Sequence, residues 1–228
     1  MPRVLRQLFG VGLVLFTKRP GCLAYPTQWF GPPAQFRGML NLSSTLSSEE
    51  LVEIVDECNV PTSPQKRSVM RRDRLIHRAT YAFVKDSDNY FYVQKRSKLK
   101  DYCPGYFDPT PGGVVGAGES YADTNTREVE EEMGIPSSVP STHLFTHYYE
   151  DERLRCFGDA WELTYDGPLK LQETEVESVY KMTMQEIISR FEAGELFTPD
   201  SLSFCYEYVK ARGMPDLPAR PPQTPELL

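Results

Sequence analysis

Three acidic residues near the middle of the chain, Glu128, Glu131 and Glu132, are spaced so that one helix would bring them together. At about 3.6 residues per turn they share an arc with Arg127 that points away from Val129. Like charges at this spacing repel by roughly 0.2–0.5 kcal/mol per pair. A hard divalent cation, Mg²⁺ or Mn²⁺, relieves the repulsion because it prefers oxygen ligands. The spacing therefore predicts a metal site that can bridge carboxylate to phosphate.

A glycine-rich segment precedes the glutamates. Glycine lets the backbone turn tightly and come close to a phosphate or a metal ion. Glu119, which ends this segment, can pair with Arg127 and so tie the loop to the helix. We therefore expect a backbone carbonyl or amide to approach the bound group at Gly112 and Gly113, within a loop that also contains Gly116 and Gly118.

The ends of the predicted helix are marked in the sequence. Ser120 is suited to cap its N-terminus, with Asp123 three residues on as an imperfect capping-box partner. Gly134 is suited to end the helix, and Pro136 prevents its continuation. A stripe at helical spacing predicts the face that packs on the core, namely Ala122, Thr126, Val129 and Met133.

Together these residues resemble the Nudix box, G-x5-E-x7-R-E-U-x-E-E-x-G-U, where U is a bulky apolar residue. Every fixed position is matched, by Gly113, Glu119, Arg127, Glu128, Val129, Glu131, Glu132, Gly134 and Ile135. The resemblance implies a Mg²⁺-dependent hydrolase of diphosphate linkages, in which Mn²⁺ can substitute. It implies metal ligands at Glu128, Glu131 and Glu132, with catalytic roles for Glu119, Arg127, Glu131 and Glu132.

The resemblance extends over roughly residues 51–212, towards the branch related to type 1 isopentenyl-diphosphate isomerase. The matching segments are His77-Arg78-Ala79, residues 93–96, Pro104-Gly105, Asp108 and residues 197–201. The isomerase uses a Cys in a T-N-T-C-C-S-H-P-like segment. Here residues 108–113 read D-P-T-P-G-G, so that Cys and the metal-binding His are missing. Isomerase activity is therefore not expected, and His77 alone fits a hydrogen-bonded structural residue better than a metal ligand.

Four further residues are candidates for the site. Lys95 and Arg96 alternate across a strand, so only one can face the pocket; either could hold a diphosphate, and the alternative is a solvated surface pair. Glu173 and Glu175 precede a predicted strand, in a region from which Nudix hydrolases often draw a further metal ligand or base. We take Glu175 as the candidate, and leave Asp159 unassigned.

Composition limits the partners. The net charge is −7, which argues against a general binder of polymeric nucleic acid or of anionic membranes. Residues 8–16 are apolar but too short to span a bilayer. The five cysteines include no C-x-x-C pair, which is typical of free thiols in a reducing compartment, with Cys103 a packing residue rather than a nucleophile. We expect a small-molecule diphosphate substrate and leave a homodimer open.

The order of predicted elements indicates an α/β protein, with a mixed β-sheet in an α/β/α sandwich, which is also the fold that the Nudix resemblance implies. Hydrophobic periodicity predicts strands over residues 51–57, 79–85, 90–96, 143–149, 154–165 and 176–182. Besides the glutamate-bearing helix, it predicts helices over residues 65–75, 184–193 and 201–212, and a loop over residues 102–111. The chain then divides into an N-terminal extension (1–48), a Nudix hydrolase domain (49–213) and a Pro-rich disordered tail (214–228).

The N-terminal extension is basic. Residues 1–48 contain no Asp or Glu and carry Arg3, Arg6, Lys18, Arg19 and Arg37. This composition resembles a mitochondrial or plastid presequence, so we expect a mitochondrial location. A secretory signal at residues 8–16 and a merely disordered extension of a cytoplasmic protein are the alternatives.

Two classes of function remain. The first is a Mg²⁺-dependent hydrolase that cleaves a diphosphate linkage in a nucleoside diphosphate joined to another moiety. The second is a Nudix-fold module that binds a phosphorylated ligand or a protein and hydrolyses nothing. The complete set of glutamates favours the hydrolase.

Overall fold

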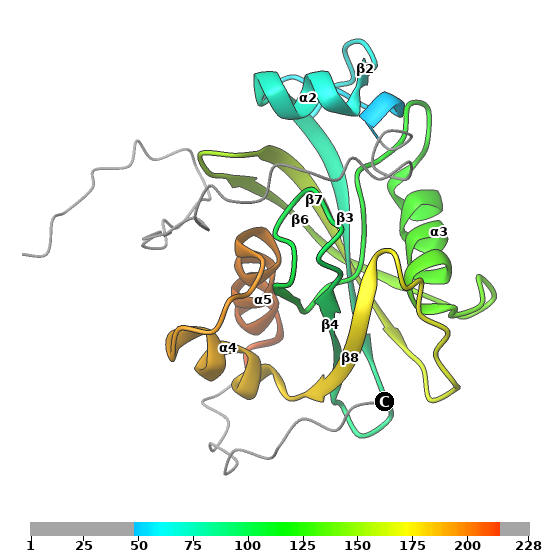
Figure 1. Ribbon diagram of the computed structural model, residues 1–228, viewed down its shortest axis with the longest axis vertical. Coiled ribbons are helices and arrows are strands. Elements are labelled where there is room, and N and C mark those ends of the chain that lie inside the picture. Colours follow the sequence, from blue (N-terminus) through cyan, green and yellow to red (C-terminus); the bar gives the residue numbers. More distant parts are fainter. Residues whose placement is uncertain (1–47, 215–228) are drawn as a thin grey trace, which may run out of the picture. The chain divides into compact units, whose positions relative to one another are not determined.

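A mixed six-stranded β-sheet forms the centre of the computed structural model, which describes residues 48–214 (Figure 1). Its strands are β3 (Ile76–Lys85), β4 (Phe91–Arg96), β5 (Phe107–Asp108), β6 (Thr142–Glu150), β7 (Arg155–Thr164) and β8 (Val176–Met182). Their order is β5-β4-β3-β7-β6, with β8 also paired to β4. β3 and β7 run parallel along their whole length, and the other pairs are antiparallel.

Helices cover both faces of this sheet (Figure 1). α3 (Tyr121–Met133) lies on one face, and α4 (Met184–Glu192) and α5 (Pro199–Arg212) lie on the other. At one end of the sheet, α2 (Arg67–Asp73) packs beside a separate two-stranded sheet of β1 (Leu51–Val52) and β2 (Gln65–Lys66). The result is the α/β/α sandwich that the order of predicted elements indicated.

The central strand β3 is apolar on both faces because both faces are covered. Its alternate residues Tyr81 and Phe83 belong to the apolar core beneath α4 and α5. Ala82 and Val84 point the other way, into the core beneath α3. Such a strand reads as a nearly continuous hydrophobic run, which is why it was identified from the sequence.

The glycine-rich segment is attached to β3 rather than lying free above the sheet. β3 and β4 share one register pair, Lys85 with Phe91. Beyond that pair the two strands separate, and the segment from Pro111 to Val115 runs beside β3. The backbone N–H groups of Thr80 and Ala82 donate to the carbonyls of Gly113 and Pro111, each at 2.9 Å. The central strand therefore fixes the position of the loop that was predicted to contact phosphate.

Most predicted elements are confirmed to within a few residues, and β8 matches its prediction at both ends. Two predictions were wrong in part. The strand over residues 51–57 ends at Val52 and continues only as isolated bridges at Ile54 and Val55. The loop over residues 102–111 contains β5, which was missed because a two-residue strand shows no periodicity. Nearly all of the predicted presequence and of the Pro-rich tail lies outside the described residues.

The search for membrane-spanning helices covered the described residues alone. None of the helices between residues 48 and 214 combines the length and the hydrophobicity needed to cross a bilayer.

Gly158, on β7, tests the packing between the sheet and α5. A Cβ atom at this position would lie 2.3 Å from the ring of Phe204 and 2.4 Å from that of Tyr81, two rings stacked at 3.8 Å. We expect Gly158→Ala to destabilise the fold by roughly 1–3 kcal/mol, because both rings must move. Urea unfolding measures the loss, with the exposed Thr164→Ala on the same strand as the control. Equal stability of the two variants would contradict this packing.

Candidate active site

The helix that carries the glutamates has the predicted ends. The side chain of Ser120 accepts a hydrogen bond from the backbone N–H of Asp123 at 3.1 Å and caps the N-terminus of α3. Gly134 ends the helix in the left-handed region, with φ of +69°. The local signals in the sequence therefore placed α3 correctly along the chain.

The orientation of α3 around its axis agrees with the prediction only in part, since Val129 and Met133 are buried as expected. Ala122 is exposed, whereas Glu132 is buried against the sheet with 4% of its side chain exposed. The predicted arc of outward-facing charges was therefore wrong at Glu132. The buried residues of the helix are Thr124, Asn125, Val129, Glu132 and Met133.

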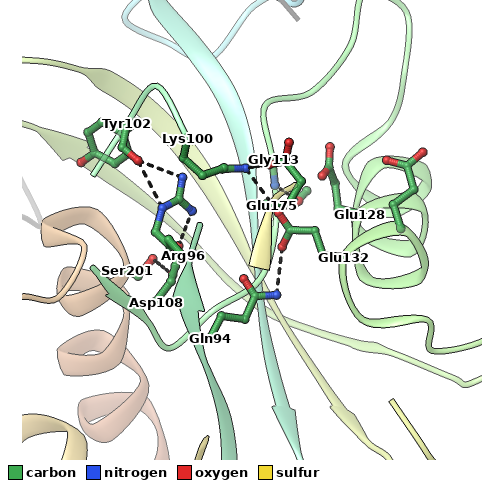
Figure 2. Close-up of polar contacts among 12 residues, drawn as sticks. Gln94, Arg96, Lys100, Tyr102, Asp108, Gly113, Glu128, Glu132, Glu175 and Ser201 are labelled. Atoms are coloured by element: carbon green, nitrogen blue, oxygen red, sulfur yellow. Dashed lines mark hydrogen bonds and ion pairs between the residues drawn. The ribbon is translucent and has the colours of Figure 1, made fainter. Parts of the chain in front are cut away.

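Polar partners from β4 and from the loop after it contact the Glu132 carboxylate (Figure 2). Gln94, on β4, donates to its Oε2 atom at 3.1 Å, and the Lys100 ammonium lies 3.6 Å from its Oε1 atom. Lys100 also contacts Glu175, just before β8. Burial raises the pKa of Glu132, although Lys100, Arg96 and Gln94 act in the opposite direction. The structure thus places Glu175 close to Glu132 through a shared lysine.

Glu128 lies one turn earlier on α3 and is largely buried against the glycine-rich loop. A Cβ atom at Gly113 would lie 2.3 Å from its carboxylate, so a larger residue there would displace that carboxylate. Burial and then the negative charge of Glu132 raise the pKa of Glu128 to about 7, against the opposing effect of Arg127. Two buried carboxylates therefore repel each other beside the loop predicted to contact phosphate.

Arg127 joins the loop to the helix, as its spacing from Glu119 predicted. Its guanidinium donates to Glu119 at 3.0 Å, to Glu128 at 2.9 Å and to Glu131 at 3.2 Å. Glu119 also accepts from the Thr124 hydroxyl at 2.7 Å. The hydrogen bond from Arg127 lowers the pKa of Glu119, which therefore stays ionised. Arg127 and Glu119 position Glu128 without facing Glu132.

Glu131 is the most exposed of the three glutamates, with 52% of its side chain exposed, and its carboxylate shares the Arg127 guanidinium with Glu128. Between residues 48 and 214, no three His, Cys, Asp or Glu side chains are gathered so that they could hold a metal ion. The role of Glu131 as a third metal ligand therefore stays a prediction. Glu128 and Glu132 by themselves fit Mg²⁺, which commonly takes one or two carboxylates and completes its shell with waters and substrate phosphates.

A cleft adjoins these carboxylates. Gly112 and Gly113 form one wall, and Arg67, Arg71, Arg96 and Lys100 supply positive charge to the lining. Its volume is about 70 Å³. The cleft is basic and can accept an anionic group such as a phosphate.

Of the two alternating residues Lys95 and Arg96, Arg96 is the one that lines the cleft. Arg96 lies in its wall, where it donates to Asp108 at 2.8 Å and to the Tyr102 carbonyl at 3.0 Å (Figure 2). Lys95 lies over the ring of Phe107, with its ammonium 4.1 Å from the ring centre. The prediction of a phosphate contact is therefore not supported for Lys95, and the Arg96 guanidinium is already engaged by protein groups.

Several residues of the site were not identified from the sequence. Gln94, Lys100, Arg67 and Arg71 have no distinctive spacing, because they come together only through the tertiary fold. Asp200, at the start of α5, is buried in the cleft and accepts hydrogen bonds from Tyr81 at 3.0 Å and from Tyr102 at 3.1 Å. Burial raises the pKa of Asp200 to about 6.

The remaining candidates have structural roles. His77 is buried, its ring contacts the Leu75 carbonyl at 3.1 Å, and burial lowers its pKa to about 4. Burial raises the pKa of the Cys103 thiol to about 12, as expected for a packing residue. Asp159 pairs with His143 at 3.3 Å, and Glu173 is exposed.

Comparison with known proteins agrees with this geometry. A family model described as the NUDIX domain matches residues 75–200. The chain belongs to the Nudix family. An uncharacterized Nudix hydrolase of Salmonella typhi, YfcD, is 43% identical over 157 residues, which cover 69% of this chain and 83% of that protein. YfcD of Escherichia coli K12 is 42% identical over 165 residues, covering 72% and 89%.

A solved structure supports the fold. DR0079 from Deinococcus radiodurans superimposes with a TM-score of 0.62 at 22% identity, over 69% of this chain and 98% of that one. The predicted α/β Nudix fold, a mixed sheet with flanking helices, is confirmed. These matches establish the Nudix domain and leave the resemblance to the isomerase branch as a prediction.

Replacing Glu128 measures how much its buried carboxylate lowers the stability of the fold. Above a pH of about 7 the folded protein must hold an ionised carboxylate that the unfolded chain exposes freely to water, and this destabilises the fold. Because the folded pKa is raised, the cost disappears as the pH falls through about 7 towards the usual value of 4.5. With metal removed, we expect Glu128→Gln to be more stable than the wild type at about pH 8, by roughly 1–2 kcal/mol, and the gain to shrink at about pH 5.

Thermal unfolding in the presence of a chelator measures both values. The exposed Glu130→Gln on the same helix is the matched control and should change stability little at either pH. A Glu128→Gln variant that is less stable than the wild type at the higher pH would contradict the raised pKa.

Proposed function

We propose that this Nudix protein is a Mg²⁺-dependent hydrolase that cleaves a diphosphate linkage in a small molecule, such as a nucleoside diphosphate joined to another moiety. The observation that carries the proposal is the pair of buried carboxylates, Glu128 and Glu132, beside Gly113. Two such groups are costly to bury ionised unless a cation joins them. The adjoining basic cleft supplies a place for the anionic substrate.

Glu128 and Glu132 are the residues that would hold Mg²⁺, and Glu131 could join them from the outer side of α3. The ion would neutralise charge on the diphosphate and lower the pKa of a bound water. Because Gly112 and Gly113 carry no side chains, the loop packs directly against Thr80 and Glu128. Arg127 keeps Glu128 directed at the loop.

Lys100 and Glu175 are the groups best placed to act near Glu132. The Lys100 ammonium neutralises Glu132 and Glu175 in the arrangement described, and it lines the cleft as well. Glu175 is a candidate to accept a proton from the attacking water, because it lies across Lys100 from Glu132. Hydrolysis of the diphosphate would then require the Lys100 ammonium to move away from either Glu132 or Glu175, so that this carboxylate is free.

A substrate screen tests the proposal. The full chain is incubated with Mg²⁺ and nucleotide sugars, dinucleoside polyphosphates, NADH, coenzyme A, oxidised nucleotides or prenyl diphosphates. Release of a monophosphate or of phosphate that stops when Mg²⁺ is chelated is the expected result. Binding of a compound without release from any of them would favour the module that only binds.

With the substrate in hand, Glu132→Gln should lower kcat by roughly a hundredfold or more, because it removes a metal ligand at unchanged size. Glu131→Gln should have a smaller effect, since Glu131 is half exposed and pairs with Arg127. Glu130→Gln, exposed on the same helix, is the control. Full activity of the Glu132 variant would rule out its role.

Lys100 gives a test of cation binding that needs no substrate. Lys100→Met keeps the length of the side chain and removes the charge that now satisfies Glu132 and Glu175. We expect the metal-free variant to bind Mn²⁺ about tenfold more tightly than the wild type, because the ion no longer competes with an ammonium. Calorimetric titration measures the affinity, with the exposed Lys98→Met as control. Unchanged or weaker binding would show that Lys100 and the cation do not share these carboxylates.

A further inference from the structure

We propose that Arg67 and Arg71 form a second anion subsite, which binds a phosphate monoester or carboxylate group of the substrate beyond its diphosphate. The proposal rests on the proposed function in taking the diphosphate to lie against Gly112 and Gly113. It adds that the substrate carries a further anionic group, and it assigns that group to α2.

Both arginines face the cleft from the same side of α2. They are four residues apart, so one helical turn separates them, and both are among the residues that line the cleft. Arg72, between them in sequence, points to solvent with 70% of its side chain exposed. α2 lies at the end of the sheet (Figure 1). The two like charges therefore meet at the α2 end of the cleft.

The protein neutralises these two charges weakly. Arg67 pairs with Glu50 at 3.1 Å, and Arg71 lies 3.6 Å from Asp101, too far for a hydrogen bond. Both carboxylates are considerably exposed, so these pairs contribute little. The Nε atoms of both arginines are buried and have no hydrogen-bond partner within the described part of the chain. A buried donor without an acceptor costs free energy that a bound anion would recover.

The carboxylates inside the cleft are not available to these arginines. Asp108 accepts from Arg96 at 2.8 Å and from the Ser201 hydroxyl at 2.7 Å (Figure 2). Asp200 accepts from two tyrosine hydroxyls, one at each oxygen. The cleft therefore keeps unsatisfied positive charge at its α2 end, while its negative groups are saturated by other partners.

A third polar group in the cleft also lacks a partner. The hydroxyl of Thr110, a residue 2% exposed, is buried without a hydrogen bond, two residues before Gly112. This orphan group belongs to the same cleft as Arg67 and Arg71 but to a different segment of the chain. Unpaired donors from two separate elements are the pattern expected of a cleft whose ligand supplies the acceptors.

The geometry favours an oxyanion over other ligands. The Arg71 guanidinium lies over the ring of Tyr102, 5.2 Å from its centre, which restricts the plane of the guanidinium before any ligand binds. A guanidinium held in this way presents a fork of N–H donors that matches phosphate or carboxylate oxygens. His77 beside them stays neutral, because burial and then the charges of Arg71 and Arg67 lower its pKa. His77 therefore adds no third positive charge beside Arg67 and Arg71.

Anion binding by the metal-free full chain tests the proposal without requiring turnover. Inorganic phosphate and acetate are titrated separately by calorimetry, in a chelator and at constant ionic strength. We expect the double variant Arg67→Gln/Arg71→Gln to bind phosphate about tenfold more weakly than the wild type, or worse, because two charge-assisted contacts are lost. Arg72→Gln, on the same helix, should bind like the wild type. The same loss with acetate would show that the subsite takes carboxylates as well.

Equal phosphate affinity of the double variant and the wild type would overturn the proposal, as would an equal loss in Arg72→Gln. If the double variant unfolds, the single variant Arg71→Gln takes its place, with Arg71→Lys expected to restore part of the binding because it keeps the charge. Hydrolysis is scored separately in the substrate screen. A protein that binds phosphate through Arg67 and Arg71 but hydrolyses nothing would keep the subsite and refute the proposed function, and active protein with unchanged phosphate binding would do the reverse.

Discussion

The buried carboxylate of Glu132 is the group on which the arrangement of the site depends. A carboxylate in this position is tolerated only because Gln94 and Lys100 supply hydrogen bonding and charge from elsewhere in the chain. Lys100 also pairs with Glu175. The contacts around Glu132 therefore connect α3, β4, the loop after β4 and the segment before β8. A helix position buried against a sheet is more often apolar. Here the contacts of Glu132 with Gln94 and Lys100 both orient α3 and bring the residues of the site together.

The two sides of α3 carry their charge differently. On the outer side, Arg127 satisfies three glutamates at once, and this ion-pair network resembles an ordinary stabilising device. On the inner side, Glu128 and Glu132 remain in mutual repulsion, and burial disfavours their ionised forms. One face of the helix therefore stabilises the fold and the other destabilises it. Functional groups commonly lower the stability of a fold in this way.

Local signals in the sequence were sufficient for the position of α3, for the strands of the sheet and for the family. The cap at Ser120, the stop at Gly134 and the spacing from Glu119 to Arg127 all depend on residues that are neighbours in the chain. The burial of Glu132 was missed because hydrophobic periodicity cannot register a buried glutamate whose partners come from other elements. Gln94, Lys100 and the arginines of α2 were missed for the same reason. Their positions follow from contacts between distant segments, which a single sequence does not show.

The parallel pairing of β3 with β7 has a consequence for the order in which the protein assembles. β3 supports the glycine-rich segment, yet its long partner β7 follows the glutamate helix in the chain, as does α5, which contributes Asp200 and Ser201 to the cleft. During synthesis the acidic helix therefore leaves the ribosome before the strand that will hold its platform in place. Until β7 has been made, the sheet against which Glu132 is buried is incomplete. The repulsion between Glu128 and Glu132 thus develops late in folding, after most of the hydrophobic residues that offset its cost have been synthesised.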